Sequence, residues 1–133
     1  MTTYVEARDA IVTFITSNFT DIPVFWENTL EVDLDEVDDR FLRVEIDFNA
    51  GEQISIEFSP QDRTYGIVVL TVMTKEGLGT RATLAVQDTL KQLLRHQTLS
   101  GVVLRTPVPG DKQVKGGWEA RELLVPFHFD SYG

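Results

Sequence analysis

Two neighbouring stretches in which apolar and polar residues alternate constrain the fold of this chain more than any other feature. The first runs from Phe41 to Phe48, and the second covers residues 53–58. Alternation with a period of two is typical of a strand that buries one face. The segment between them, Asn49-Ala50-Gly51-Glu52, contains residues that tolerate positive φ. We therefore predict a β-hairpin whose turn lies at residues 49–52.

Two further segments have the periodicity of amphipathic helices. Apolar residues recur at helical spacing from Thr3 to Phe19, and Thr3 followed three residues later by Glu6 fits a capping box. The second predicted helix begins with Thr80 as its cap and ends near His96. Its apolar stripe consists of Ala82, Val86, Leu90, Leu93 and Leu94. Because each helix must bury its stripe, we expect both to pack against the sheet.

Further segments predict strands and complete the fold class. They are Pro23 to Glu27, Thr64 to Thr74, Gly101 to Arg105 and Trp118 to Asp130. The second of these is rich in β-branched residues and long enough for a strand buried largely on both faces. Pro126 cannot donate to a ladder, so the last strand should lie at an edge of the sheet or carry a bulge. The order of segments predicts an α+β fold: a single domain over residues 1–133, with a mostly antiparallel sheet, an N-terminal helix and one further helix packed on one face.

Composition excludes several classes of protein. At 133 residues, two independent cores would be unusually small. The absence of cysteine excludes a disulfide framework and a thiolate metal site. No apolar run approaches the roughly 20 residues that cross a bilayer, and Met1 to Tyr4 lack the basic head of a secretory signal. We therefore expect an intracellular protein without membrane contact.

Almost all of the net charge of −9 lies in one segment. Between Glu27 and Asp39 the chain has seven acidic residues and no basic one, whereas the remainder has 14 acidic and 12 basic residues. The net charge argues against binding nucleic acid through its phosphates, which needs clustered Lys and Arg, and no sequence-specific nucleic-acid binding is predicted. A calcium loop is not predicted either, because Val37 stands at a ligand position after Asp33-x-Asp35 and the required glycine is absent. We interpret the segment as a charged surface loop, whose candidate interaction residues are Glu31, Asp33, Asp35, Glu36, Asp38 and Asp39.

The motif Gly77-x-Gly79-x-x-Ala82 allows two interpretations. It follows a predicted strand and opens a helix, so it formally matches the dinucleotide fingerprint, in which N–H groups at a helix N-terminus hold a pyrophosphate. However, the chain lacks the alternating strand and helix units of such a fold, and the next strand ends in Arg105 rather than in the acid that binds a ribose. The two glycines serve a tight turn equally well. We favour the turn and predict no cofactor.

The C-terminal part of the chain supplies a second candidate surface. Thr106 to Gly117 is predicted as a loop, long enough to be functional or mobile, and it carries Lys112 and Lys115. The candidate interaction residues of the last strand are Trp118, Pro126 and His128. Neither His96 nor His128 stands in a recognisable catalytic motif, so no catalytic residue is predicted.

A set of short segments occurs in order along most of the chain. The N-terminal part contributes the amphipathic helix, Val24-Phe25-Trp26-Glu27-Asn28 and Phe41-Leu42-Arg43-Val44. The C-terminal part contributes Gly66 to Val72, the Gly77-x-Gly79 turn with its helix, and Gly117-Trp118 leading to Val125-Pro126-Phe127. Together these segments resemble the tail terminator proteins of long-tailed bacteriophages.

The resemblance implies a structural function without catalytic residues. Proteins of that family are small α+β subunits that form a hexameric ring at the head-proximal end of the tail tube. The resemblance implies that this chain stops tube polymerisation and presents the surface for head joining, with the tail tube protein and head–tail connector proteins as partners. The implied location is the virion tail, after assembly in the cytoplasm of the bacterial host. Two other functions stay open: a head–tail connector or neck subunit of the same assembly, and a small nucleotide-binding enzyme that uses the Gly77 turn.

Overall fold

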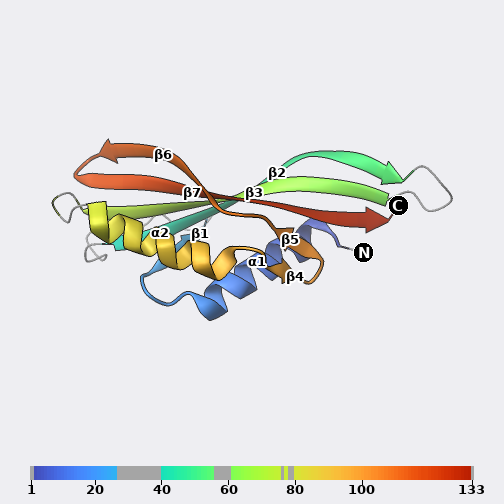
Figure 1. Cartoon of the computed structure of the whole chain (residues 1–133), viewed down its shortest axis with the longest axis horizontal. Helices are drawn as coiled ribbons and strands as arrows, with labels where there is room; N and C mark the ends of the chain where they lie inside the picture. Colours follow the sequence, from blue (N-terminus) through green and yellow to red (C-terminus); the bar gives the residue numbers. More distant parts are fainter. Residues whose placement is uncertain (1, 27–39, 56–60, 76, 78–79, 133) are drawn as a thin grey trace.

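In a computed structural model of the protein, two helices pack on a seven-stranded sheet (Figure 1). The structure describes residues 2–26, 40–55, 61–75, 77 and 80–132. The elements are α1 (Tyr4–Asn18), β1 (Val24–Trp26), β2 (Arg40–Ser55), β3 (Gln61–Lys75), α2 (Thr80–Leu94), β4 (Thr98–Leu99), β5 (Val102–Leu104), β6 (Val108–Lys115) and β7 (Trp118–Tyr132). The strand order is β1-β2-β3-β7-β5-β4, and β6 also pairs with β7. The β1–β2 pair is parallel and the other described pairs are antiparallel, so the predicted α+β class is confirmed.

Helix α1 forms as its sequence predicts. The Thr3 hydroxyl accepts a hydrogen bond from the Glu6 backbone N–H, and the Glu6 carboxylate accepts one from the Thr3 N–H. The predicted capping box is therefore present, and it satisfies two of the N–H groups that a helix start leaves unpaired. The residues of this helix that are fully buried in the core are Ala7, Ile11 and Ile15. Phe19 ends the helix in an extended conformation and is also buried.

The hairpin predicted within residues 41–58 is wrong. Strand β2 continues through residues 49–52, and its antiparallel partner is β3. A register shift falls between Phe48 and Gly51, where β2 carries one residue more than β3. Asn49 and Ala50, which suggested a turn, therefore form a β-bulge, whereas Gly51 and Glu52 pair with Thr64 and Arg63. Because the strand continues, the backbone on both sides of the bulge pairs with β3. In the predicted hairpin, the two halves of β2 would have paired with each other instead.

Strand β3 is buried on one face only. Its even-numbered residues from Thr64 to Thr74 are buried, whereas the odd-numbered residues from Arg63 to Met73 are half-exposed. The prediction that this strand is buried on both faces is therefore wrong. Helices α1 and α2 share one core with the buried face of the sheet, and both lie on that side in Figure 1. Among the described residues no helix covers the opposite face, which we call the uncovered face.

Helix α2 runs from Thr80, the residue predicted as its cap, to Leu94, slightly before the predicted end near His96. His96 has a left-handed backbone (φ 59°), which takes the chain out of the helix. The chain then forms the β4–β5 hairpin, whose first strand is too short to be predicted from sequence. Ser100 and Gly101 at its turn both have positive φ (49° and 92°).

Helix α2 is joined to the sheet by a buried polar contact as well as by its apolar stripe. Thr83 is fully buried, and its hydroxyl hydrogen-bonds to that of Thr74 on β3 (3.1 Å). Val86, Leu90 and Leu94 follow on the same side of the helix and reach the core. Because each threonine hydroxyl provides the partner of the other, both can be buried at low cost.

The segment Thr106 to Gly117, predicted as a loop, contains strand β6. This strand forms a hairpin with β7, closed by the Lys115↔Trp118 pair. The two residues between them, Gly116 and Gly117, both have positive φ (59° and 82°), as a type I′ turn requires. The prediction of a loop is therefore wrong. The strand has no clear alternation, and its early proline and glycine are residues that usually mark loops.

The prediction that Pro126 marks an edge strand is also wrong, because β7 is central. It pairs with β3 on one side and with β6 and β5 on the other. The Pro126 carbonyl accepts a hydrogen bond from the Arg105 N–H (2.8 Å), so the Pro126 nitrogen faces the side of β5 and β6 as well. Pro126 lies between Leu124, a partner of β6, and Phe127, a partner of β5. The missing N–H therefore falls in a gap between two partner strands.

The core lies between the two helices and the sheet. Its largest fully buried side chains include Phe127 and Phe129 of β7, Ile11 and Ile15 of α1, and Leu90 of α2. Neither α1 nor α2, the helices of the described part of the chain, has the length and apolar character that crossing a bilayer requires.

Candidate functional site

The uncovered face of the sheet contains a groove of about 370 Å³. Val69, Thr71 and Met73 of β3 line it, together with Ala120 of β7. These side chains lie on the same face because Met73 pairs with Ala120 in the register of the two strands and the others alternate with core residues. The groove therefore follows from the alternation of β3 and β7 and from the absence of a helix over this face in the described chain.

Charged side chains stand at the rim of this groove. Arg43 and Glu45 come from β2, Asp111 from β6 and Glu122 from β7. The Arg43 guanidinium approaches the Glu45 carboxylate only to 4.0 Å, and both side chains are well exposed, so this ion pair is weak. The Glu122 carboxylate accepts a hydrogen bond from the Asp111 backbone N–H (3.1 Å), which ties β6 to the groove. Three carboxylates and one guanidinium give the rim a net negative charge.

A small aromatic cluster closes one end of the groove. The Trp118 ring packs edge-to-face on Phe41 (centroids 5.3 Å apart), and Phe41 packs in the same way on Phe25 (5.5 Å). Met73 packs against these rings, and Trp118 is only 7% exposed. The Lys75 ammonium lies 5.9 Å from the centroid of the Trp118 ring, within cation–π range. Trp118 is therefore a fixed wall of the groove.

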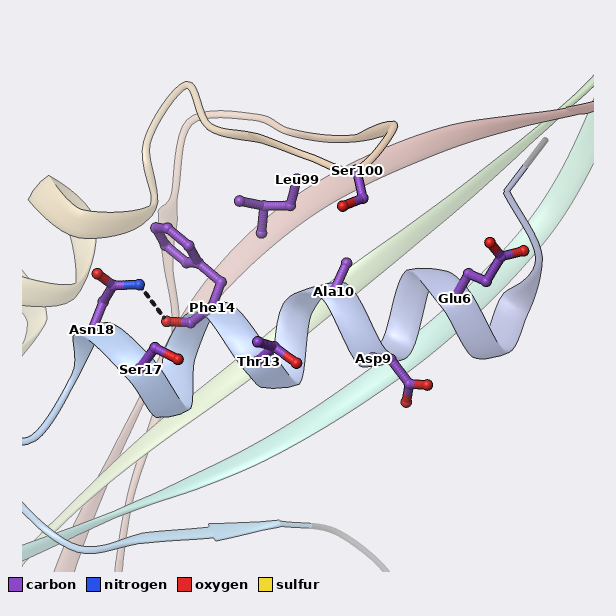
Figure 2. Close-up of a pocket in the computed structure, with 9 residues that line it drawn as sticks. All are labelled: Glu6, Asp9, Ala10, Thr13, Phe14, Ser17, Asn18, Leu99 and Ser100. Atoms are coloured by element: carbon purple, nitrogen blue, oxygen red, sulfur yellow. Dashed lines mark hydrogen bonds between the residues drawn. The ribbon is translucent and has the colours of Figure 1, made fainter.

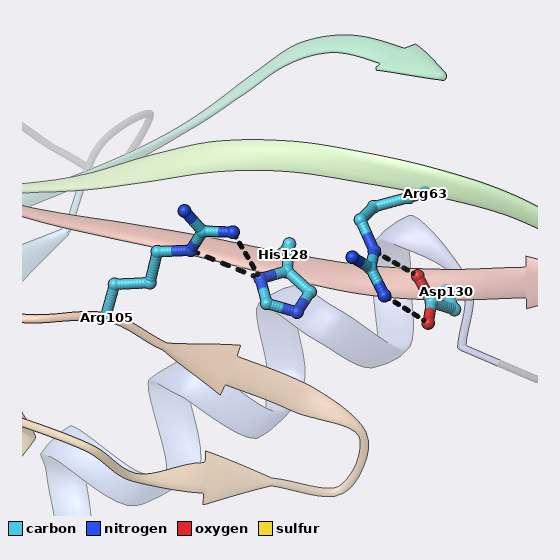
Figure 3. Close-up of polar contacts among 4 residues, drawn as sticks. All are labelled: Arg63, Arg105, His128 and Asp130. Carbon is cyan, nitrogen blue, oxygen red and sulfur yellow. Dashed lines mark hydrogen bonds and ion pairs between the residues drawn. The ribbon is translucent and has the colours of Figure 1, made fainter. Parts of the chain in front are cut away.

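Polar side chains gather at the opposite end of the uncovered face (Figure 3). Arg63 of β3 donates two hydrogen bonds to the Asp130 carboxylate of β7 (2.9 and 3.2 Å), and this hydrogen bonding raises the pKa of the guanidinium. Two nitrogens of the Arg105 guanidinium each lie 3.4 Å from Nδ1 of His128. The same guanidinium lies 5.8 Å from the centroid of the Tyr65 ring. This end of the face is therefore basic, in contrast to the groove.

The surroundings of His128 favour its neutral form. Burial lowers its pKa from the ordinary value of 6.5, and the positive charges of Arg63 and Arg105 act in the same direction, while Asp130 opposes them. When Nδ1 accepts a hydrogen bond from Arg105, the neutral ring carries its proton on Nε2. His128 is half-exposed and lies on the uncovered face.

His128 is expected to make the protein less stable as the pH falls. In the unfolded chain it titrates near pH 6.5, whereas in the folded chain its pKa is lower. As the pH drops through 6.5 the unfolded chain therefore binds more protons, and the free energy of unfolding decreases until the folded ring is protonated too. Replacing His128 with glutamine should remove this part of the decrease, measured by urea denaturation between about pH 5 and pH 7.5. The control is His96→Gln at an exposed position; the same pH dependence in the His128→Gln variant and the original protein would contradict the expectation.

A second groove of about 550 Å³ lies between α1 and the β4–β5 hairpin (Figure 2). Phe14 and Leu99 are its large apolar residues, and Glu6 lies near one end. The Asn18 amide donates a hydrogen bond to the Phe14 carbonyl (2.8 Å), and Glu6 caps the helix start. Asn18 and Glu6 are thus already used to stabilise helix α1 and are less available to a ligand. We therefore take the groove on the uncovered face as the stronger candidate site.

The structure places the predicted interaction residues in different regions. The acidic residues Glu31, Asp33, Asp35, Glu36, Asp38 and Asp39 lie outside the described residues. Lys112 is exposed on β6 and pairs with Arg121, so it lies on the opposite face from the groove, whereas Lys115 pairs with Trp118 through the backbone. Trp118, Pro126 and His128 share the uncovered face of β7. Ten residues separate the first from the last, which is about 33 Å along a strand.

The Gly77 turn lacks the setting of a dinucleotide site. Gly77 has positive φ (95°) just before α2, which agrees with a tight turn. Strand β3 before it and β5 after α2 both pair antiparallel with β7, so they run in the same direction but are separated by β7 and do not pair with each other. In the dinucleotide fold the strands before and after the helix are parallel and lie next to each other. The described residues also contain no group of three or more His, Asp or Glu side chains that could hold a metal ion.

Sequence reasoning did not find the groove. Val69 and Met73 belong to a continuous apolar run, which predicts burial on both faces, and Asp111 was part of a predicted loop. The pattern that pointed to an open face was the charged alternation of β2, where Arg43 and Glu45 separate apolar residues. A layer that covered the outer face of β3 would also cover the adjacent outer face of β2. The charged side chains on that face of β2 therefore indicate that the outer face of β3 is open as well.

The fold and the groove define a small α+β protein with one uncovered sheet face. No family model matches the chain, and no curated protein is similar to it. One solved structure has a TM-score of 0.64 and 17% sequence identity, and the match covers 95% of this chain and 97% of the other. At this identity the similarity shows a shared fold over almost the whole length of both chains and carries no functional assignment.

Proposed function

We propose that this chain is a structural subunit of a phage tail, which forms a homo-oligomeric ring that caps the tail tube, ends its polymerisation and provides the surface for head joining. Its partners would be other copies of itself, the tail tube protein and the head–tail connector proteins. The ordered set of segments described above supports this assignment, and a small α+β domain is compatible with it. The acidic segment 27–39 is also compatible, because a negatively charged channel repels passing DNA instead of holding it.

The outer edge of β6 is the structural feature that best supports a contact between subunits. In the described part of the chain this eight-residue strand pairs with β7 alone. Val108 and Val114 are 44% and 57% exposed on it. A strand edge with exposed apolar side chains is a surface on which another chain can add. The register shift between Pro109 and Lys112 limits regular pairing to the end of the strand that contains Val114.

Replacing Val114 with lysine is expected to prevent ring formation without unfolding the subunit. The exposed site tolerates a charge in the isolated subunit, whereas the same charge in a packed interface lacks its water. Light scattering gives the mass in solution, and negative-stain images show whether rings form. Val5→Lys is the matched control, because Val5 is 66% exposed but lies on α1. Rings formed equally by the Val114→Lys variant would place the contact elsewhere, and a protein that never forms rings would contradict the proposal.

The alternative within the same assembly is a head–tail connector or neck subunit. Electron microscopy of tails produced without the protein separates the two functions. Overlong tubes are expected if the protein ends polymerisation. Headless tails of normal length would instead identify a connector.

A further inference from the structure

The groove on the uncovered face combines an apolar floor with a negative rim. Val69 and Met73 provide the floor, and Ala120 adds little bulk above it. The carboxylates of Glu45 and Glu122 stand on the two strands that flank β3. The residues opposite them on β3, Val69 and Thr71, are two positions apart, so strand spacing and this offset place the two glutamate backbones about 12 Å apart. A long side chain with an apolar stem and a charged end can therefore lie on the floor with its end between the two carboxylates.

The carboxylates of the rim can accept further hydrogen bonds. Glu122 uses one oxygen for the Asp111 N–H, and a carboxylate has about four acceptor positions. The Glu45 side chain is 42% exposed, and its 4.0 Å separation from Arg43 is too long for a hydrogen bond. The existing contacts hold these groups near the groove without using their capacity for an external cation.

We propose that this groove binds an arginine or lysine side chain carried by an extended segment of a different protein. The negative rim selects a basic side chain, and the apolar floor selects one with a hydrocarbon stem. The ring proposed above uses the outer edge of β6 for the neighbouring copy, so the groove is assigned to a different partner. The inference concerns a partner other than the neighbouring ring subunit and does not depend on ring formation.

A short peptide tests the groove directly. The probe is an acetylated, amidated tripeptide with arginine between two leucines, and its control contains citrulline, the neutral isostere of arginine, at the centre. In NMR titrations we expect the arginine peptide to shift the Trp118 indole N–H and the Ala120 amide resonances. The citrulline peptide should bind roughly fivefold more weakly, the size expected for one or two exposed ion pairs. Equal affinities, or shifts confined to the groove beside α1, would overturn the proposal.

A charge-matched pair of variants separates the groove from the overall charge of the protein. Glu45→Gln with Glu122→Gln removes two rim charges, while glutamine at position 122 can still accept the Asp111 N–H. Asp21→Asn with Asp88→Asn removes the same charge at exposed positions outside the groove. The first double variant should bind both peptides equally, and the second should keep the roughly fivefold preference for arginine. Near-unchanged amide spectra without peptide verify that each variant folds.

Each remaining outcome counts for or against the groove. An equal loss of preference in both double variants would show non-specific attraction and overturn the proposal. Concentration-dependent shifts at Trp118 without any peptide would identify a second copy as the occupant and also overturn it. Rings seen in negative stain together with absent peptide binding would refute the groove and leave the ring intact, so the two proposals fail separately.

Discussion

Replacing Phe127 with alanine is expected to lower the free energy of unfolding by about 3–5 kcal/mol. Phe127 is 1% exposed, and its ring lies 5.8 Å from the ring of Phe48 and 6.5 Å from that of Phe129, measured between centroids. Truncation removes buried apolar area and leaves a cavity that β3 cannot move to close, because β3 and β7 are held in a continuous ladder. Urea denaturation followed by circular dichroism measures the change.

The control for this variant lies on the same strand. Leu124→Ala removes an apolar side chain from the uncovered face of β7, where Leu124 is half-exposed. A loss of only about 1 kcal/mol is expected there, since less area leaves contact with water on folding and no closed cavity forms. Similar losses for both variants would contradict the placement of the core on one face of the sheet.

Replacing Gly66 with alanine is expected to destabilise the protein by about 1–3 kcal/mol, although alanine is ordinarily the better residue in a strand. Gly66 stands in register between Phe48 and Phe127, and the Phe127 ring lies over it. A Cβ at this position would contact the tip of that ring and would stand 2.7 Å from the Asp47 carbonyl oxygen. The ring can shift, but the carbonyl belongs to the neighbouring strand and cannot move without disturbing the ladder. Urea denaturation measures the loss.

A double variant tests whether the clash is with the ring. Leucine at position 127 removes the outer ring atoms that an alanine at position 66 would meet. The loss for Gly66→Ala combined with Phe127→Leu should therefore be smaller than the sum of the two single losses. Strict additivity would show that the Asp47 backbone, and not the ring, determines the cost.

Local features were read correctly where the determining residues are close in sequence. The capping box of Thr3 and Glu6 depends on groups three residues apart, and the apolar stripes of α1 and α2 depend on one helical period. The turn at Gly77 likewise needs only local backbone freedom. For these elements the spacing of residue types is sufficient, because the interactions that they report lie within one or two turns of the chain.

Strand pairing was read wrongly where local chemistry is ambiguous. Asn49 to Glu52 suits both a turn and a bulge, and the choice depends on whether β3 is available as a partner along the whole of β2. Pro126 suits an edge, but it equally suits a gap between two partners in a central strand. Only the pairing of strands distant in sequence distinguishes such alternatives.

The candidate site was predictable only in part. Of the residues nominated on β7, Trp118 lines the groove, whereas Pro126 and His128 lie elsewhere on the same face of the strand. The groove itself needs β6, whose proline and glycine suggested a loop, and it needs Glu45 from a strand more than 70 residues away from Glu122 in the sequence. A site assembled across four strands has no signature in any one of them.

The residue pattern alone therefore established an α+β chain with two amphipathic helices, strands of period two and strongly localised negative charge, since each of these follows from neighbours along the chain. Which strands pair, that β7 is central, and that one sheet face lacks a helix in the described chain were decided by contacts between distant segments. The physical reason is that a strand cannot satisfy its own backbone hydrogen bonds, so its partner and its covering layer must come from elsewhere.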